Sequence, residues 1–260
     1  LPAPGPTAIE SRVAAPIPQL SVIIPARNEA LNLPQLIAEI ETALAAVTPF
    51  EIIVVDDGSS DDSVSVLDGL RRDRPYLQLV RHDRSGGQSA AIHSGVRRAR
   101  ASIVCMLDGD GQNPPAELPK LAAPLLRDTT GRLGLVAGQR VGRQDTWSKK
   151  LASRFANGLR SALLQDGTRD TGCGLKAFRR DAFLDLPYFN HMHRFLPALF
   201  KRDGWRIELV DVSHRPRQAG RSNYSNLQRA LVGAIDLFGV MWLIRRSKKA
   251  QPVAGDQEDT

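Results

Sequence analysis

Cysteine is scarce in this sequence. Among 260 residues only Cys105 and Cys173 are cysteines, one in an apolar run and the other in a glycine-rich stretch. They provide neither a disulfide framework nor a zinc site, which is typical of a protein from a reducing compartment. The histidines show no metal-ligand spacing and no neighbouring nucleophile, so we expect them to be structural.

The sequence also lacks the signatures of several common enzyme classes. It contains no Ser-His-Asp nucleophile elbow, no G-x-G-x-x-G motif after the first apolar run and no Walker loop. These absences argue against a hydrolase, a dehydrogenase and an NTPase. A secretory signal peptide is not expected, because residues 1–18 contain five prolines and no apolar core.

Long hydrophobic runs are missing as well. The run at residues 231–244 is interrupted by Asp236 and is shorter than the roughly twenty residues that a membrane-spanning helix requires. Its apolar residues recur at helical spacing and lead into Arg245 and Arg246, which predicts an amphipathic helix with a polybasic end. A helix at a membrane interface and a buried terminal helix with a solvated tail both fit this pattern.

What the sequence does contain is an excess of positive charge. The net charge is +7 and the isoelectric point is near 9.8, which predicts an anionic partner such as a nucleic acid, a membrane surface or a phosphorylated substrate. We do not expect a nucleic acid, because the basic residues lack interleaved aromatic residues or a recognisable binding module.

Apolar runs alternate with helical patterns along most of the chain. Buried strands are predicted at residues 20–24, 51–55, 76–80, 103–107, 133–138 and 205–212. Helical patterns separate the first four runs, as at residues 88–98. This alternation predicts an α/β fold with right-handed crossovers and a mostly parallel sheet that carries helices on both faces.

Composition divides the chain into four segments. Residues 1–19 are rich in proline and alanine and predict a flexible arm. Residues 20–224 form the main domain, residues 225–249 the C-terminal amphipathic helix and residues 250–260 a polar tail. Within the main domain, residues 147–164 predict a basic amphipathic helix that suits either the domain surface or anionic lipid.

Two carboxylates follow the fourth predicted strand. Asp108 and Asp110 alternate with glycines, which let the chain turn so that both carboxylates converge with Gln112 on one hard cation, Mg²⁺ or Mn²⁺. Such a cation commonly binds the diphosphate group of a substrate. A simple Asp-Gly turn that binds nothing is the alternative, but the position after a buried strand favours metal and diphosphate.

Polar residues also follow the first two predicted strands. Carboxylates at strand ends can accept hydrogen bonds from a base and from ribose hydroxyls, and we predict this role for Glu29 and Asp57. For Asp61 and Asp62 we favour capping of the following helix instead. A second anion site could assemble from residues of the later loops, namely Asp170, Lys176, Arg215, Arg217, Arg221 and Ser222. Each of these basic residues would also suit a solvated loop.

Five segments together resemble a known family. The segments LSVIIPARNEALNL, EIIVVDDGSSDDS, MLDGDGQNPP, DTGCGLKAFRR and HRPRQAGRSNY occur in this order within residues 20–224. They resemble the family-2 glycosyltransferases of the GT-A fold, and they are most similar to polyprenyl-phosphate glycosyltransferases related to dolichol-phosphate mannose synthase. The Q-x-x-R-W signature of processive polysaccharide synthases is absent.

The resemblance implies a role for individual residues. Those implied to hold the nucleotide sugar are Pro25, Ala26, Glu29, Asp57 and Asp108. Those at the family's metal-binding positions are Asp108, Asp110 and Gln112. Those at positions that bind the acceptor's phosphate are Lys176, Arg217 and Ser222.

The resulting hypothesis is an inverting, metal-dependent transfer of a sugar from a UDP- or GDP-sugar to a polyprenyl phosphate of dolichyl or undecaprenyl type. The protein would lie in the cytoplasm, peripheral on the inner face of the cytoplasmic membrane, and homo-oligomers are left open. Asp110 or Asp170 would act as a catalytic base only if the acceptor were a hydroxyl, because a phosphate is already ionised. The alternatives are a soluble glycosyltransferase acting on a sugar or protein hydroxyl and a non-catalytic nucleotide-sugar-binding protein.

Overall fold

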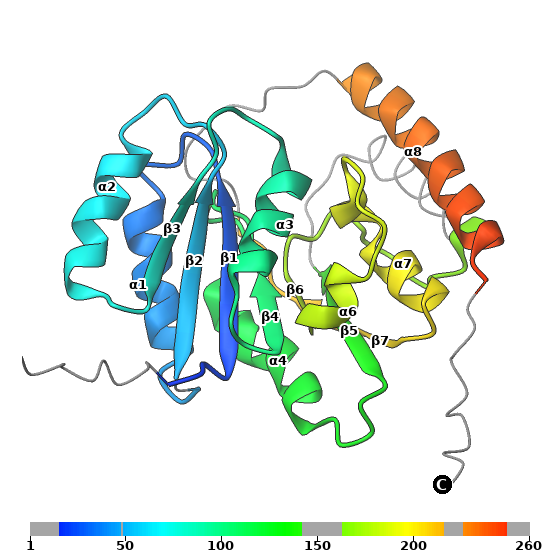
Figure 1. Cartoon of the computed structure of the whole chain (residues 1–260), viewed down its shortest axis with the longest axis horizontal. Coiled ribbons are helices and arrows are strands. Elements are labelled where there is room, and N and C mark those ends of the chain that lie inside the picture. Colours follow the sequence, from blue (N-terminus) through cyan, green and yellow to red (C-terminus); the bar gives the residue numbers. More distant parts are fainter. Residues whose placement is uncertain (1–15, 48, 142–162, 216–225, 249–260) are drawn as a thin grey trace, which may run out of the picture.

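The computed structural model describes residues 16–47, 49–141, 163–215 and 226–248. These residues form a seven-stranded sheet in the order β3-β2-β1-β4-β6-β5-β7, with helices on both faces (Figure 1). The α/β architecture expected from the sequence is therefore confirmed. The strands are β1 (Leu20–Ala26), β2 (Phe50–Asp56), β3 (Leu77–Arg81), β4 (Ile103–Met106), β5 (Leu133–Arg140), β6 (Lys176–Arg179) and β7 (Arg206–Val212).

Helices connect most of these strands. The α-helices are α1 (Leu33–Ala43), α2 (Ser63–Leu70), α3 (Gln88–Arg98), α4 (Leu118–Arg127), α6 (Arg180–Leu184), α7 (Leu196–Arg202) and α8 (Asn226–Arg246). Short 3-10 helices are η1 (Arg71–Asp73), η2 (Pro115–Glu117) and η3 (Met192–Arg194). Helix α3 has the bounds that the sequence pattern predicts. Helices α1, α4 and α7 each carry a proline in the first turn, where its missing N–H costs no hydrogen bond.

The sheet separates two apolar clusters. Val22 and Ile24 of β1 lie in the cluster with α1, α2 and α4, whereas Ile23 lies in the cluster with α3, α6, α7 and α8. Successive side chains of a strand point to opposite faces, so a strand covered on both faces must be apolar throughout. This explains why β1, β2 and β4 appear in the sequence as nearly continuous apolar runs, whereas β3, which is only partly buried, contains Gln78.

β1 extends further than the sequence predicts. We expected Pro25 to end the strand, but β1 continues through Pro25 and Ala26. The Ile23 carbonyl accepts the Leu107 N–H on the β4 side, and the Ala26 carbonyl accepts the Asp57 N–H on the β2 side. By this alternation Pro25 faces the β4 side beyond the end of β4, so its missing N–H breaks no bond of the sheet.

β6 is the one antiparallel strand among the described residues. It lies between β4 and β5 and pairs antiparallel with both, with Lys176 opposite Met106 and Ala137. The sequence pattern did not reveal this short strand, because it follows directly on a glycine-rich loop. Its position brings Lys176 to the edge of the sheet at which β4 ends.

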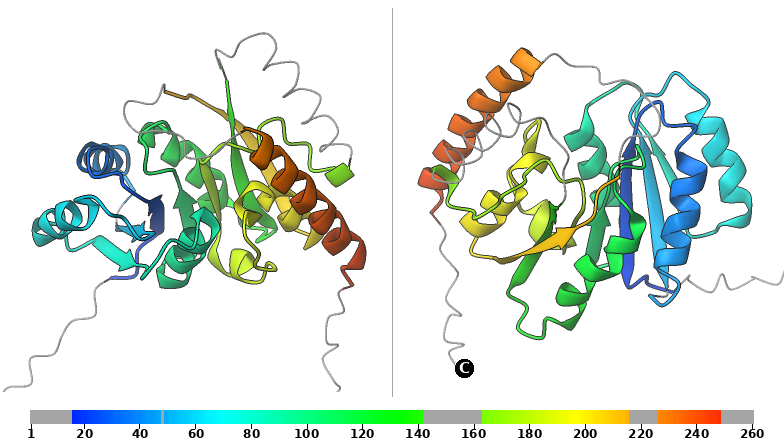
Figure 2. Two further views of the ribbon diagram at one scale, coloured as in Figure 1. Left: turned by 90° about the horizontal axis from the view of Figure 1, so that it is seen from above. Right: turned by 180° about the vertical axis from the view of Figure 1, so that it is seen from behind.

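The predicted C-terminal helix is present as α8, which lies on the outside of the molecule beside α7 (Figure 2). None of the helices in the described ranges is both long and apolar enough to span a bilayer. The predicted helix at 147–164 lies outside the described residues except for its last two, which are helical. The arm up to residue 15 and the polar tail at 250–260 lie outside them entirely.

Candidate active site

The carboxyl ends of β1, β2 and β4 meet at one edge of the sheet. The Asp57 N–H donates to the Ala26 carbonyl at 2.9 Å. A Cβ atom added to Gly109 would lie 3.1 Å from the Pro25 carbonyl oxygen, so the turn after β4 rests directly on the end of β1. The structure therefore brings together the segments that the sequence assigns to nucleotide-sugar binding.

The Asp57 carboxylate is buried and organises the loop before α3. One oxygen accepts hydrogen bonds from the His82 ring and the Gly86 N–H at 2.7 and 2.8 Å. The other accepts from the Ser85 hydroxyl and the Gly87 N–H at 2.7 and 2.9 Å. Burial alone would raise the pKa of Asp57, but these hydrogen bonds outweigh it and lower the pKa. Because the Asp57 carboxylate already accepts these four bonds, its main effect on the site is to fix the backbone of the loop at Gly86 and Gly87.

Glu29 lies at the turn between β1 and α1. Its N–H donates to the Ser63 hydroxyl at 3.0 Å, and its half-buried carboxylate accepts from the Asn32 amide at 2.6 Å. The preceding residue, Asn28, has a left-handed backbone with φ of +57° and accepts the Ser60 N–H at 2.8 Å. These contacts join the turns after β1 and β2 into one rim.

Asp108 and Asp110 lie in the turn after β4. The Asp108 carboxylate accepts hydrogen bonds from the Gln88 amide at 2.6 Å and the Asn113 amide at 3.1 Å. Burial and the nearby Asp110 charge raise the pKa of Asp108, although Lys176 and Asn113 act in the opposite direction. The two carboxylates are thus close enough to repel each other, as expected if the glycines let both converge.

The chemistry of this turn fits a hard divalent cation. Carboxylate oxygens are preferred ligands of Mg²⁺ and Mn²⁺, and such a cation would relieve the repulsion that raises the pKa of Asp108. Asp110 is buried and accepts the Gln112 N–H at 3.2 Å. The described part of the chain contains no group of three or more His, Cys, Asp or Glu side chains suited to a metal. A cation here would take further ligands from a substrate, as Mg²⁺ commonly does.

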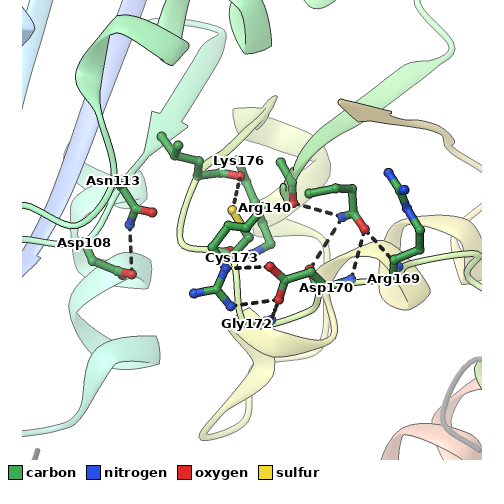
Figure 3. A network of polar contacts seen from close by, with 11 residues as sticks. Asp108, Asn113, Arg140, Arg169, Asp170, Gly172, Cys173 and Lys176 are labelled. Atoms are coloured by element: carbon green, nitrogen blue, oxygen red, sulfur yellow. Dashed lines mark hydrogen bonds and ion pairs between the residues drawn. The ribbon is translucent and has the colours of Figure 1, made fainter. Parts of the chain in front are cut away.

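Lys176 lies near the Asp108 carboxylate. It is 2% exposed, and its ammonium donates to the Cys173 carbonyl. Burial lowers the pKa of Lys176, opposed by the negative groups around it, including Asp108 and Asp170. A Cβ atom added to Gly174 would lie only 2.2 Å from an Asp108 oxygen, so the glycine-rich loop packs against that carboxylate. Figure 3 shows the hydrogen bond from Asn113 to Asp108, together with Cys173 and Lys176.

Asp170, one of the two predicted catalytic residues, is held by Arg140. The guanidinium donates to both carboxylate oxygens, with Nε–Oδ2 and Nη2–Oδ1 distances of 2.5 and 2.8 Å (Figure 3). The hydrogen bonds to Asp170 raise the pKa of Arg140, so the guanidinium stays charged. The Gly172 N–H also donates to Asp170, at 3.1 Å. Asp170 therefore anchors the glycine-rich loop.

A cavity lies between Asp108 and the glycine-rich loop. Its walls include Gln88, Asp108, residues 171–174, Lys176, His193 and Arg194. His193, which we expected to be only structural, is half-buried, with a ring nitrogen 2.7 Å from the Ser89 hydroxyl. Burial, with Lys176 and Arg194 nearby, lowers the pKa of His193 well below its ordinary value, so the ring is neutral. Sequence reasoning missed Gln88, Arg140, His193 and Arg194.

The remaining predicted acceptor residues have different outcomes. Arg217, Arg221 and Ser222 lie outside the described residues. Arg215 pairs with Glu39 of α1 at 2.7 Å, and its N–H donates to the Gln112 carbonyl at 3.0 Å. Arg215 therefore ties the segment after β7 to the turn that carries Asp108 and Asp110.

Structural comparison supports the fold alone. A glucosyl-3-phosphoglycerate synthase from Mycobacterium tuberculosis, solved with Mn²⁺, UDP and phosphoglyceric acid, matches with a TM-score of 0.66 and 18% identity over 90% of this chain and 80% of that chain. A mannosyltransferase from Pyrobaculum calidifontis, solved with GDP-Man and Mn²⁺, matches with a TM-score of 0.66 and 22% identity over 90% and 66%.

Comparison of sequences gives information beyond the fold. The chain is 35% identical over 211 residues to an undecaprenyl-phosphate 4-deoxy-4-formamido-L-arabinose transferase from Enterobacter sp. (strain 638). The match covers 80% of this chain and 63% of that relative, so the chain spans less than two thirds of its length. The family model for Glycosyl transferase family 2 matches residues 21–186, which include all of β1 but its first residue, β2 to β6, and every residue of the cavity wall up to Lys176. The chain therefore belongs to glycosyl transferase family 2.

Proposed function

We propose that this protein transfers a sugar from a nucleoside-diphosphate sugar to a polyprenyl phosphate, with inversion at the anomeric carbon and with the help of a divalent cation. One observation carries the proposal: the Asp108 carboxylate and the buried Lys176 line one cavity at the carboxyl edge of a mostly parallel sheet, and Asp110 lies in the same turn as Asp108, close enough to raise its pKa. Ligands of such sheets bind at this edge. The similarity to an undecaprenyl-phosphate sugar transferase supports the choice of acceptor.

The donor would lie across the ends of β1, β2 and β4. Pro25, Ala26 and Glu29 would line the nucleoside together with the loop that Asp57 holds. Asp108 and Asp110, with Gln112 of the same turn, would hold Mg²⁺ or Mn²⁺, which when bound neutralises charge on the departing nucleoside diphosphate. The rest of the rate acceleration would come from positioning, because the chain fixes both substrates in line.

The acceptor phosphate would lie on the Lys176 side of the cavity. The lysine charge is held at a fixed point by the Cys173 carbonyl and is shielded from water, so its attraction for an anion is stronger than that of an exposed lysine. Arg217 and Ser222 would complete the phosphate site. A phosphate oxygen is ionised at neutral pH, so its attack on the anomeric carbon needs no general base.

The hydrogen bonds of Asp170 agree with a phosphate acceptor. A base must be able to receive a proton, but Asp170 accepts two short bonds from Arg140 that favour its charged form. If the acceptor were a sugar or protein hydroxyl instead, Asp110 would be the better candidate for the base. Location on the inner face of the cytoplasmic membrane follows from the proposed lipid acceptor and is part of this proposal.

The test is an assay of sugar transfer from UDP- and GDP-sugars to polyprenyl phosphate, with Mg²⁺ or Mn²⁺ and with a chelator. We expect turnover that requires the cation and that falls on the order of 10²–10³-fold in Asp110→Asn. Asp181→Asn is the matched control, because Asp181 is an exposed carboxylate of α6 that pairs with Arg180. Full turnover with a hydroxyl acceptor and none with the lipid phosphate would overturn the proposal, as would binding of donor without transfer to any acceptor.

A further inference from the structure

Helix α8 is apolar on two opposite faces. The inner face packs against the apolar cluster that contains α3, α6 and α7, through Leu237, Val240, Met241 and Ile244. On the outer face, Ile235, Phe238 and Trp242 are 64%, 69% and 60% exposed. Their spacing of three and four residues places them in one stripe along the helix. A helix that is apolar all round is normally covered on all sides, so this outer stripe indicates a surface that another body covers.

The charges beside the stripe indicate the chemistry of the partner that would cover it. The stripe leads directly into Arg245, Arg246 and Lys248, and all three side chains are exposed. Between residues 233 and 248, where side chains are described, the only acidic residue is Asp236. Asp236 points to the inner side, where its carboxylate lies 3.0 Å from the His191 ring. The outer face therefore presents apolar and cationic groups without a carboxylate, which complements an apolar interior beneath anionic headgroups.

The position of α8 relative to the cavity strengthens this choice. His191, the partner of Asp236, immediately precedes η3. Two residues of η3, His193 and Arg194, belong to the cavity wall. A body that covers the outer face of α8 would therefore lie about one helix diameter, roughly 10 Å, from the segment that continues into the cavity wall.

We propose that the outer face of α8 docks on the surface of a bilayer that contains anionic lipid. The helix would lie in the plane of the interface, with Phe238 and Trp242 inserted below the headgroups and the cations at its end among the phosphates. This inference rests on the proposed function in one respect, because docking brings the cavity to the phase in which a polyprenyl phosphate resides.

The test uses the full chain with vesicles of phosphatidylcholine, with or without about one third phosphatidylglycerol. We expect sedimentation with the anionic vesicles and a blue shift of tryptophan fluorescence as Trp242 enters the interface. Phe238→Ser combined with Ile235→Ser should weaken vesicle binding at least about tenfold while Trp242 remains as the reporter. Removal of Arg245, Arg246 and Lys248 by substitution to Gln should cost roughly fivefold for each cation.

Matched controls separate docking from folding and from catalysis. Ile17→Ser removes an apolar side chain that is 78% exposed and lies before β1, so it should leave vesicle binding unchanged. Thermal melts of every variant establish that each is folded. The α8 variants should keep full turnover on a short-chain, water-soluble polyprenyl phosphate, so failure of docking and failure of the proposed function give different results.

Three results would overturn the docking proposal. The first is a wild-type chain that stays in the supernatant with anionic vesicles. The second is equal vesicle binding by the wild type and by the Ile235→Ser, Phe238→Ser variant. The third is a dimer in sedimentation equilibrium that this variant dissolves, because the stripe would then be covered by a second copy of the chain.

Discussion

Glu51 and Asp108 are carboxylates at opposite ends of the parallel strands, Glu51 near the start of β2 and Asp108 after the end of β4. Their surroundings shift their pKa values in opposite directions. Glu51 is fully buried. One of its oxygens accepts from the Ser21 hydroxyl and the Arg100 N–H, and the other from the Gln78 amide and the Arg100 guanidinium, at 2.6 to 3.1 Å. Burial would raise the pKa of Glu51, but these bonds outweigh it and lower the pKa.

Among the described residues, two side chains donate hydrogen bonds to Asp108, and a second carboxylate lies nearby, so burial and this neighbouring charge raise its pKa instead. The Glu51 edge therefore uses a carboxylate to fasten β1, β2 and β3 together. At the Asp108 edge, the surrounding chain disfavours the ionised form of the carboxylate, as its raised pKa shows. Such perturbed groups are common at binding sites. The supply of hydrogen-bond donors therefore distinguishes the roles of the two acids.

The substitution Asp108→Asn should have the largest effect and tests whether Asp108 serves activity rather than stability. Turnover should fall on the order of 10²–10³-fold, because a ligand for the cation and its charge are lost. Stability should be unchanged or higher, since the substitution removes repulsion with Asp110. Steady-state kinetics and urea melts on the same preparation check both statements. A less stable variant with normal kinetics would assign Asp108 to the structure rather than to the site.

Glu51→Gln should have the opposite profile. It removes the charge that pairs with Arg100 and turns one accepting oxygen into a donor that faces other donors. We expect a loss of about 2–3 kcal/mol in the free energy of unfolding, below the full cost of a buried pair because Arg100 is partly exposed. Urea titration measures the loss, and kcat per folded molecule should stay within a factor of about two. Impaired catalysis at normal stability would reverse our assignment of the two edges.

Gly174→Ala tests how tightly the glycine-rich loop confines Asp108. The added Cβ would lie 2.2 Å from the Asp108 oxygen, so the carboxylate or the loop must shift. A displacement of about 1 Å in an active site can cost on the order of 10²-fold in rate. Gly69→Ala is the control, because its Cβ would meet no atom within 4 Å and alanine favours the helix. Equal activity of the two variants would show that the Gly174 contact does not constrain catalysis.

The smallest expected effect is a change in the pH dependence of stability. The folded-state pKa of Glu51 is lowered from 4.5, so its stabilising contribution is present above pH 4.5 and is lost as the pH falls below it. Glu51→Gln should therefore flatten the loss of stability below pH 4.5, whereas Asp181→Asn, which changes an exposed carboxylate of α6, should not. Urea melts between about pH 3 and 7 provide the measurement. Parallel pH curves for wild type and Glu51→Gln would contradict the lowered pKa.

The sequence predicts the edge of the sheet well because its signals are local. Each parallel strand covered on both faces is an apolar run, and the polar residues directly after it must lie at the common edge. Pro25, Asp57 and Asp108 could be assigned in this way from their position along the chain alone. Their convergence in the structure follows from parallel pairing of the neighbouring strands.

The far wall of the cavity could not be predicted, because its contacts join residues distant in sequence. Ser89 and His193 are 104 residues apart, and Arg140 and Asp170 belong to segments whose pairing depends on β6. β6 has only four residues, too few for a periodic pattern. Arg140 did carry one usable signal, since it is a polar residue that follows an apolar strand, like Asp108.

The central claim is that the carboxyl-edge cavity binds a nucleoside-diphosphate sugar together with a divalent cation. The most direct test is the thermal melting temperature of the wild type, Asp108→Asn and Asp110→Asn with UDP- and GDP-sugars, each with and without Mn²⁺. A ligand that binds only the folded chain raises its stability, by about 2.7 kcal/mol at a hundredfold excess over Kd. We predict stabilisation of the wild type that needs both the sugar nucleotide and Mn²⁺ and that disappears in both variants. Equal stabilisation without the cation, or in the variants, would contradict the account.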